Sequence, residues 1–209
     1  MKAGITMATT LFASGMAMAQ AANFEQDRLG QAPAGWTCGV TGSGAPRWTV
    51  ELEPGAPPAA PHVLMQSGAG DFPWCVRTGS AVQDGYVEVR FKPLRGREDQ
   101  AGGVVWRWKD GKNYYVARAN ALENNVSLYY TEDGRRRTLK YVDAPVAINA
   151  WHLLRVEFKG TGIQVALDGK VAITFDDDHI TGTGAVGVWT KADSVTAFKD
   201  FSVGPSGKP

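Results

Sequence analysis

Arginine, tyrosine and asparagine side chains recur through segment 102–130 at spacings that suit one face of a β-sheet. The segment is predicted to form three strands separated by two turns. Side chains alternate between the two faces of a strand, so polar residues that alternate with bulky apolar ones share the opposite face. The alternation therefore predicts a common outer face for four side chains: Arg107, Tyr114, Arg118 and Asn120.

Two arginines on this face need compensation, because like charges side by side on a sheet are destabilising. Arg107 and Arg118 flank an Asp-Gly turn at Asp110, so their strands are expected to pair directly. Glu88, Glu123 or a bound ligand would supply the negative charge. A solvated ladder of ion pairs is the alternative, since such pairs on sheet faces are common and weak.

The aromatic and planar polar groups of this face favour a sugar ligand. Aromatic faces stack on polyhydroxylated rings, and planar guanidinium and amide groups hydrogen-bond with hydroxyls. Trp189 and Lys191 lie two residues apart, on one face of another predicted strand, and would extend the surface. A place in the core is the alternative for Trp189.

Carboxylates that could catalyse glycoside hydrolysis are not obviously paired. The reaction usually takes two carboxylates that flank the scissile bond. Glu88, Glu123, Glu98 and Asp99 come near the predicted face, but no two stand two or four residues apart on one strand. Glu123 and Glu88 are the candidates for a catalytic acid or base. The sequence has no G-x-S-x-G elbow, the motif of many serine hydrolases.

Metal-ligating patterns are sparse. The three histidines are scattered, which disfavours a catalytic metal with several histidine ligands. The acidic run at 176–178 could hold a structural calcium ion, because hard cations take carboxylate oxygens. A solvated turn is the favoured interpretation, because three adjacent side chains on a strand cannot all point one way. The metal content therefore stays open, and no cofactor is firmly implied.

The first residues read as an export signal. Lys2 precedes an apolar, uncharged stretch, and Ala17-Met18-Ala19 fits the small-x-small cleavage pattern. We expect cleavage after residue 19 and a single domain over 20–209, in the periplasm or secreted. After Lys2 is removed, 21 basic residues balance 21 acidic ones, which disfavours nucleic acid or an anionic membrane as the partner.

Cys38 and Cys75 are the two cysteines of the chain. In an exported protein, an isolated pair is most simply a disulfide.

The rest of the sequence predicts an all-β fold. About eleven short strands follow one another from Val63 onward, with one more at residues 48–52 and almost no helix. Asp-Gly pairs at Asp110, Asp133 and Asp168 lie between strand candidates and suit tight hairpins. These features favour a β-sandwich or jelly roll over a barrel or propeller.

Segment 102–130, together with segments 149–152, 167–169 and 184–194, resembles the 3-keto-disaccharide hydrolase domain family. That family belongs to the concanavalin A-like lectin/glucanase superfamily. The resemblance implies a jelly roll of two curved antiparallel sheets with a carbohydrate groove on the concave sheet. Carried over residue by residue, it assigns the groove to a polar set: Arg107, Asn113, Tyr114, Arg118, Asn120 and Glu123.

Three hypotheses for the function follow. The leading one is an exported domain that binds a glycan or sugar derivative on its concave sheet. The second is a glycoside hydrolase, similar to the 3-keto-disaccharide hydrolases, that uses the same groove. The third is a structural or protein-binding sandwich without a sugar site. The sugar and the oligomeric state cannot be predicted from the sequence.

Overall fold

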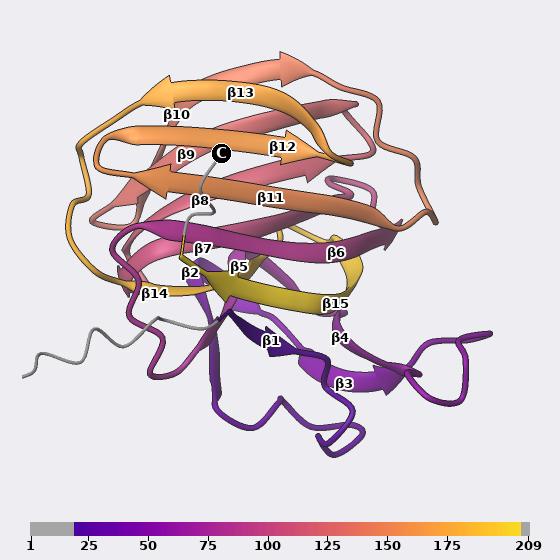
Figure 1. Cartoon of the computed structure of the whole chain (residues 1–209). Helices are drawn as coiled ribbons and strands as arrows, with labels where there is room; N and C mark the ends of the chain where they lie inside the picture. Colours follow the sequence, from indigo (N-terminus) through magenta and orange to yellow (C-terminus); the bar gives the residue numbers. More distant parts are fainter. Residues whose placement is uncertain (1–18, 206–209) are drawn as a thin grey trace, which may run out of the picture.

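The computed structural model describes residues 19–205 and is built from strands in two antiparallel sheets packed face to face (Figure 1). Within these residues, no helix has the length and apolar character needed to cross a bilayer. The predicted export signal lies outside the described residues except for Ala19. The strands are β1 (Gln20–Ala22), β2 (Trp36–Ala45), β3 (Trp48–Leu52), β4 (His62–Gln66), β5 (Ala69–Arg77), β6 (Gly85–Arg95), β7 (Ala101–Asp110), β8 (Asn113–Asn120), β9 (Asn125–Glu132), β10 (Arg135–Asp143), β11 (His152–Lys159), β12 (Gly162–Leu167), β13 (Lys170–Asp176), β14 (Ala185–Trp189) and β15 (Val195–Gly204).

Sheet A has the order β13-β12-β11-β6-β15-β4-β3, with β1 paired to β15, and faces the viewer in Figure 1. Sheet B has the order β10-β9-β8-β7-β14-β5-β2 and lies behind it. Strands β7 to β10 form one meander and β11 to β13 another, and they lie in opposite sheets. The predicted all-β sandwich of two antiparallel sheets is therefore confirmed.

The core lies between the two sheets, and the alternation of side chains explains it. In β6, Val87, Val89 and Phe91 are buried, and in β8 Tyr115 and Ala117 are buried in the same cluster. Each fully buried Val or Phe side chain stabilises the fold by roughly 1.5–3 kcal/mol relative to an exposed one. Alternation along the sequence of these two strands predicts the same inward faces, and the structure confirms them.

The predicted hairpin turns are also present. Asp133-Gly134 joins β9 to β10 with φ angles of 49° and 78°, and Asp168-Gly169 joins β12 to β13 with φ angles of 51° and 79°. Two successive positive φ angles form the turn whose twist matches that of the flanking strands. Gly111, between β7 and β8, has a packing role, because a Cβ there would lie 2.8 Å from the Trp74 ring.

The predicted disulfide joins Cys38 of β2 to Cys75 of β5, directly opposite each other in neighbouring strands. Neither strand was predicted, because the strands expected from the sequence leave out residues 67–84 and those before residue 48. Glycines interrupt β2 and Pro73 interrupts β5, and both residue types weaken a strand pattern. Pairing across the sheet holds these strands despite their composition.

A bulge at Arg107 changes the predicted faces of β7. The register of β7 against β8 shifts between Trp106 and Asp110, and Arg107 has a φ of 46°. A bulge adds one residue and reverses the alternation beyond it. Trp108 therefore packs on the outer face, where its ring centroid lies 5.2 Å from that of Trp74. Strict alternation in the sequence predicts that Trp108 shares the core face of Trp106, and the structure shows that this prediction is wrong.

Candidate functional site

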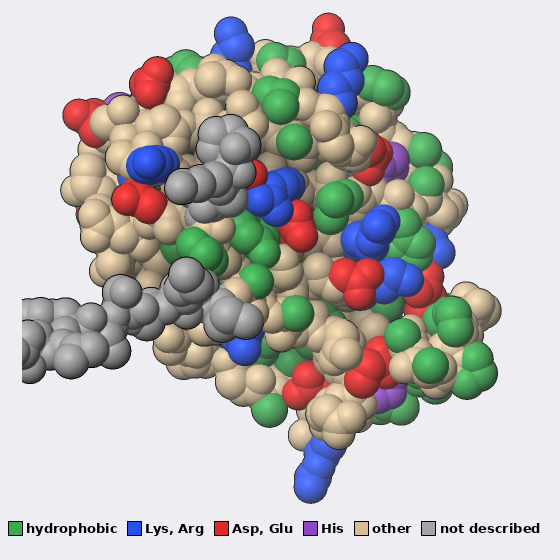
Figure 2. All heavy atoms as spheres, in the orientation of Figure 1, with side chains coloured by type: hydrophobic (Ala, Val, Ile, Leu, Met, Phe, Trp, Pro, Cys, Tyr) green, Lys and Arg blue, Asp and Glu red, His purple; other side chains and the backbone are tan. Residues whose placement is uncertain are grey.

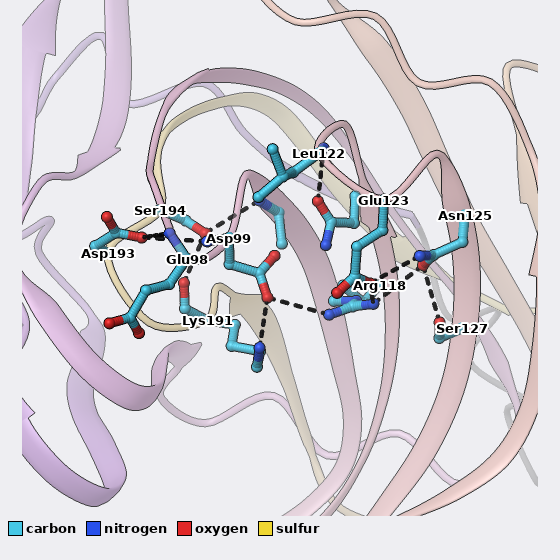
Figure 3. A network of polar contacts seen from close by, with 12 residues as sticks. Glu98, Asp99, Arg118, Leu122, Glu123, Asn125, Ser127, Lys191, Asp193 and Ser194 are labelled. Carbon is cyan, nitrogen blue, oxygen red and sulfur yellow. Dashed lines mark hydrogen bonds and ion pairs between the residues drawn. The ribbon is translucent and has the colours of Figure 1, made fainter.

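The outer face of sheet B carries polar side chains in register across three strands. Arg118 of β8 lies beside Ser127 of β9, which lies beside Tyr141 of β10. In the next row of outward-facing residues of β8 and β9, Asn120 lies beside Asn125. These rows converge on a group of side chains that we call the polar cluster: Asp99, Arg118, Glu123, Asn125 and Lys191 (Figure 3).

Arg118 is the centre of the polar cluster, and Figure 3 shows its guanidinium between Asp99 and Glu123. Its Nη1 donates to Asp99 Oδ2 over 3.2 Å, and its Nη2 donates to Glu123 Oε2 over 2.6 Å. Nη2 also donates to Asn125 Oδ1 over 3.0 Å. The Arg118 side chain is 3% exposed, so it holds its neighbours in place from below the surface.

Asp99 is fully buried, although it belongs to a loop. Its Oδ2 accepts hydrogen bonds from Arg118 and from Lys191 Nζ, the latter over 2.8 Å. Asp193 fixes this loop by accepting from three backbone amides: Arg97, Glu98 and Asp99. Burial raises the pKa of Asp193, but these amides outweigh it, so the net pKa is lowered and the carboxylate stays ionised.

Glu123 brings a carboxylate to the surface of the polar cluster, with 40% of its side chain exposed. Burial raises its pKa, but hydrogen bonds from Asn125 and Arg118 and the charge of Arg118 outweigh burial and lower it overall. Glu123 is therefore an anion and a hydrogen-bond acceptor at neutral pH. Asn125 Nδ2 also donates to Tyr141 Oη, which joins an exposed phenol to the polar cluster.

The remaining predicted site residues of β8 lie at different depths. Tyr114 is fully buried, and its hydroxyl lies 2.8 Å from Thr41 Oγ1. Asn120 is also fully buried, and its Oδ1 accepts from the amide of Leu122. Asn113 is the first residue of β8, directly after the β7–β8 turn, and its Nδ2 donates to Asp110. The prediction that Tyr114, Arg118 and Asn120 lie on the outer face of the sheet is confirmed.

Trp189 is fully buried, but on the outer side of sheet B rather than in the main core. It belongs to an aromatic layer on the outer side of the sheet, next to the polar cluster. Its ring stacks on Phe72 with centroids 5.9 Å apart. The layer consists of Phe72, Trp74, Trp108, Tyr114, Tyr129 and Trp189.

Arg136 covers part of this aromatic layer. Its guanidinium carbon lies 4.3 Å from the Tyr129 ring centroid, 4.6 Å from that of Phe72 and 5.7 Å from that of Trp189. From the sequence, the arginine run 135–137 after Asp133-Gly134 is expected to form a solvated turn. β10 instead begins at Arg135, and its register against Thr131 turns Arg136 onto the outer face.

A depression of about 590 Å³ adjoins both the polar cluster and the aromatic layer. Lys191 and Phe72 lie in its wall, together with Glu98 and Asp71. The Asp71 carboxylate accepts from the amide of Ser43. A ligand in the depression would meet one aromatic ring, one ammonium group and several carboxylates.

Arg107 does not join Arg118, so the prediction of a shared arginine face is wrong. The bulge turns its side chain away, and it donates to the backbone carbonyls of Ile180 and Gly160 over 3.1 and 2.6 Å. It also lies 3.7 Å from Asp84. Arg107 therefore ties together loops at one end of the sandwich.

Glu88 lies on the outer face of sheet A, opposite the sheet that holds Glu123. It accepts from Arg155 Nη1 over 2.7 Å and from Ser202 Oγ over 3.1 Å. Figure 2 shows this side of the molecule, where Lys and Arg side chains lie beside Asp and Glu side chains. Glu88 and Glu123 therefore cannot act together on one bond, which corrects their prediction as a shared site.

The acidic run has internal partners. Asp177 accepts a hydrogen bond from the Tyr115 hydroxyl and contacts the His179 ring over 2.9 Å, while Asp176 accepts from Thr161. Within residues 19–205, no three His, Cys, Asp or Glu side chains gather as a metal site. Calcium stays a prediction from the sequence.

The chain resembles known proteins both in sequence and in fold. No protein-family model matches the chain, so the specific resemblance to 3-keto-disaccharide hydrolases stays a prediction. The chain is 26% identical over 170 residues to the levanase of Bacillus subtilis (strain 168), a match that covers 80% of the chain and 22% of that protein.

Two solved structures show the same fold. A carbohydrate-binding module, CBM66, from Bacillus subtilis superposes with a TM-score of 0.64 at 20% identity, over 80% of this chain and 94% of that one. A β-glucanase from Bacillus licheniformis superposes with a TM-score of 0.59 at 13% identity, over 93% and 100% of the two chains. The chain thus has the jelly-roll sandwich fold of these carbohydrate-active proteins.

Proposed function

We propose that this chain is a carbohydrate-binding module that holds its ligand on the outer face of sheet B. The observation that carries the proposal is the polar cluster, in which the buried pair Arg118 and Asp99 presents Glu123 and Lys191 at the surface. Sugar hydroxyls both donate and accept hydrogen bonds, so a fixed acceptor beside a fixed donor suits them. The adjoining depression offers room and an aromatic wall.

The rigidity of the polar cluster supports binding, because preorganised groups lose less entropy when the ligand arrives. Two hydrogen bonds from Arg118 and Asn125 fix the Glu123 carboxylate, and Asp99 fixes the Lys191 ammonium. The exposed atoms therefore contact the sugar, and the buried ones set their positions.

The pKa of Glu123 and the positions of the other carboxylates favour binding over hydrolysis. A glycosidase needs a carboxylic acid whose pKa is raised enough to donate a proton. The pKa of Glu123 is lowered, Asp99 is ion-paired and buried, and Glu88 lies on the other sheet. A hydrolase like the 3-keto-disaccharide hydrolases is the alternative, in which Glu123 would act as the base.

The comparisons support a sugar ligand without naming it. One similar structure is described as a carbohydrate-binding module, and the similar curated protein is a levanase. This chain spans about a fifth of that levanase, so a binding role is the more suitable proposal. The levanase name makes levan one of the first polysaccharides to test.

We also propose export to the periplasm or the medium. Disulfides persist in oxidising compartments, and Cys38 and Cys75 form one. The predicted signal at residues 1–19 agrees with this proposal.

Affinity electrophoresis and calorimetry against neutral and acidic polysaccharides, levan among them, test the proposal. We expect at least one to bind, and Glu123→Gln to weaken that binding about tenfold or more, as for a hydrogen bond to a charged group. Glu88→Gln makes the same change on the opposite sheet and should leave binding within twofold. Equal losses in the two variants, or no binding to any polysaccharide, would overturn the proposal.

A further inference from the structure

We propose that Arg136 receives an oxyanion of the sugar ligand, so that the site takes an acidic saccharide. The inference rests on the proposed sugar-binding function and adds the chemical class of the ligand. The oxyanion would be a carboxylate or a sulfate ester attached to a pyranose or furanose ring.

The first observation is the environment of the Arg136 guanidinium. Two aromatic rings, Phe72 and Tyr129, lie within 4.6 Å of its central carbon. Its Nη1 is buried and has no hydrogen-bond partner among residues 19–205. An arginine stays charged in proteins and has five donors in a planar fork, so an unpartnered buried nitrogen is costly. An oxyanion would accept from this fork in bidentate geometry.

The second observation is the charge balance around it. In the polar cluster, Arg118 and Lys191 already form ion pairs with the carboxylates of Asp99 and Glu123, so their charges balance. None of the ion pairs within residues 19–205 includes Arg136. Burial and the nearby charge of Arg118 lower the pKa of Arg136 more than Tyr129 and Asp99 raise it, which agrees with a cation that has no direct ion pair. A ligand anion would provide it.

The acidic side chains of the depression do not fill this role. Asp71 and Asp193 are engaged by backbone amides, at Ser43 and at residues 97–99. Glu98 also lines the depression, and no ion pair within residues 19–205 joins it to Arg136. We therefore place the oxyanion on the Arg136 side, with the sugar ring extending toward Glu123 and Lys191.

The geometry also explains how Arg136 could respond to a ligand. The aromatic faces hold the guanidinium plane, and small changes in the side-chain torsions would shift its donors along these faces. A small rotation would turn the unpartnered nitrogen toward an incoming oxyanion while the stacking is kept. Arg136 is thus a specificity-determining residue for the proposed ligand.

Paired ligands test the inference. Oligogalacturonate and its methyl ester share one sugar backbone, but only the former carries charged carboxylates, and a sulfated oligosaccharide and its desulfated form make the corresponding comparison for sulfate. By calorimetry, we expect the wild-type protein to bind one acidic form about tenfold or more tightly than its neutral counterpart. The pair with the larger ratio identifies the oxyanion. High salt should reduce the ratio, because it screens charge.

Three variants assign the preference to one side chain. Arg136→Met should reduce the ratio to below about twofold, and Arg136→Lys, which keeps the charge but not the fork, should leave an intermediate ratio. Arg137→Met removes the same charge from the neighbouring exposed residue of β10 and should keep the wild-type ratio. Arg136→Lys retains a charged side chain on the rings and serves if Arg136→Met does not fold.

Equal binding of acidic and neutral forms by the wild type would overturn the inference, as would a ratio that survives Arg136→Met and Arg136→Lys. In either case, binding of a neutral sugar that Glu123→Gln weakens would leave the proposed function standing. Failure of every saccharide to bind would instead remove the proposed function, and this inference with it.

Discussion

Arg118 and Asp99 form an ion pair that is almost completely removed from water. Arg118 Nη1 lies 3.2 Å from Asp99 Oδ2, and the two side chains are 3% and 0% exposed. Burying such a pair costs desolvation energy comparable to the attraction between the charges, so the pair does little for stability by itself. Its position beneath Glu123 and Lys191 gives it another role, which is to hold the surface groups of the polar cluster.

The pair should be costly to break. Arg118→Met leaves the Asp99 carboxylate buried with only Lys191 as its partner, and we expect a loss of about 3 kcal/mol in the free energy of unfolding. Arg155→Met removes an arginine from a partly exposed pair with Glu88, and its cost should stay near 1 kcal/mol or less. Urea unfolding of both variants makes the comparison. Similar losses would show that the buried pair has no special structural role.

The disulfide should stabilise the sandwich through its unfolded state. The bond between Cys38 and Cys75 closes a loop with a sequence separation of 37. The double variant Cys38→Ser, Cys75→Ser is expected to lose about 3–4 kcal/mol of the free energy of unfolding, by the chain-entropy relation. Denaturant unfolding without reductant measures it. A loss below about 1 kcal/mol would mean that the β2–β5 ladder needs no covalent support.

Gly39 should tolerate no side chain, because the Trp74 ring lies flat on it. A Cβ at Gly39 would come within 2.7 Å of the ring, and the surrounding layer leaves the tryptophan little room to move. Gly39→Ala is expected to cost about 1–3 kcal/mol, as overpacking does. At Gly162 a Cβ makes only ordinary contacts, at 3.4 Å or more, so Gly162→Ala is the matched control. Equal melting temperatures for the two variants would contradict this packing.

The pH dependence of binding should report Glu123. Its pKa is lowered below the ordinary value of 4.5 in the folded protein, so the carboxylate is ionised throughout the neutral range. Stability from this group is present above the unfolded-state pKa and is lost as the pH falls through the folded-state pKa. Sugar affinity that depends on the ionised carboxylate should likewise be constant through the neutral range and fall only at a pH below the ordinary pKa of 4.5.

Glu123→Gln should abolish the fall in sugar affinity at low pH, because the amide does not titrate. Calorimetry of both proteins across the pH range makes the measurement. Binding that instead weakens as the pH rises toward neutrality would indicate a protonated Glu123, and the hydrolase alternative would then gain support.

Much of the fold could be predicted because the strands of the main core follow simple alternation. In β8, Tyr115 and Ala117 alternate with Tyr114 and Arg118, and the structure keeps both sets on the predicted faces. Such a pattern is clear when one face is buried in a continuous core. Two of the three Asp-Gly turns also have the predicted positive φ angles.

Local breaks in alternation could not be predicted. The bulge at Arg107 adds one residue to β7, and no residue type near it signals that position. Its effect is large, because it removes Arg107 from the site and brings Trp108 to the outer face. Similarly, Arg136 was assigned to a turn because consecutive arginines suggest solvent, whereas the register of β10 decides its direction.

The site itself depends on contacts between distant segments. Asp99 reaches Arg118 because Asp193, nearly a hundred residues away, caps the amides of its loop. Sequence spacing contains no such information. Arg118, Glu123 and Lys191 were each predicted for the groove, and their arrangement around a buried carboxylate is what the structure adds.

An NMR titration with a saccharide that binds tests the central claim most directly. Our account predicts that backbone and side-chain signals shift at Arg118, Glu123 and Lys191 on the outer face of sheet B. Signals of Glu88 and Arg155 on sheet A should stay unchanged. Shifts concentrated on sheet A, or spread without preference over both sheets, would contradict the account.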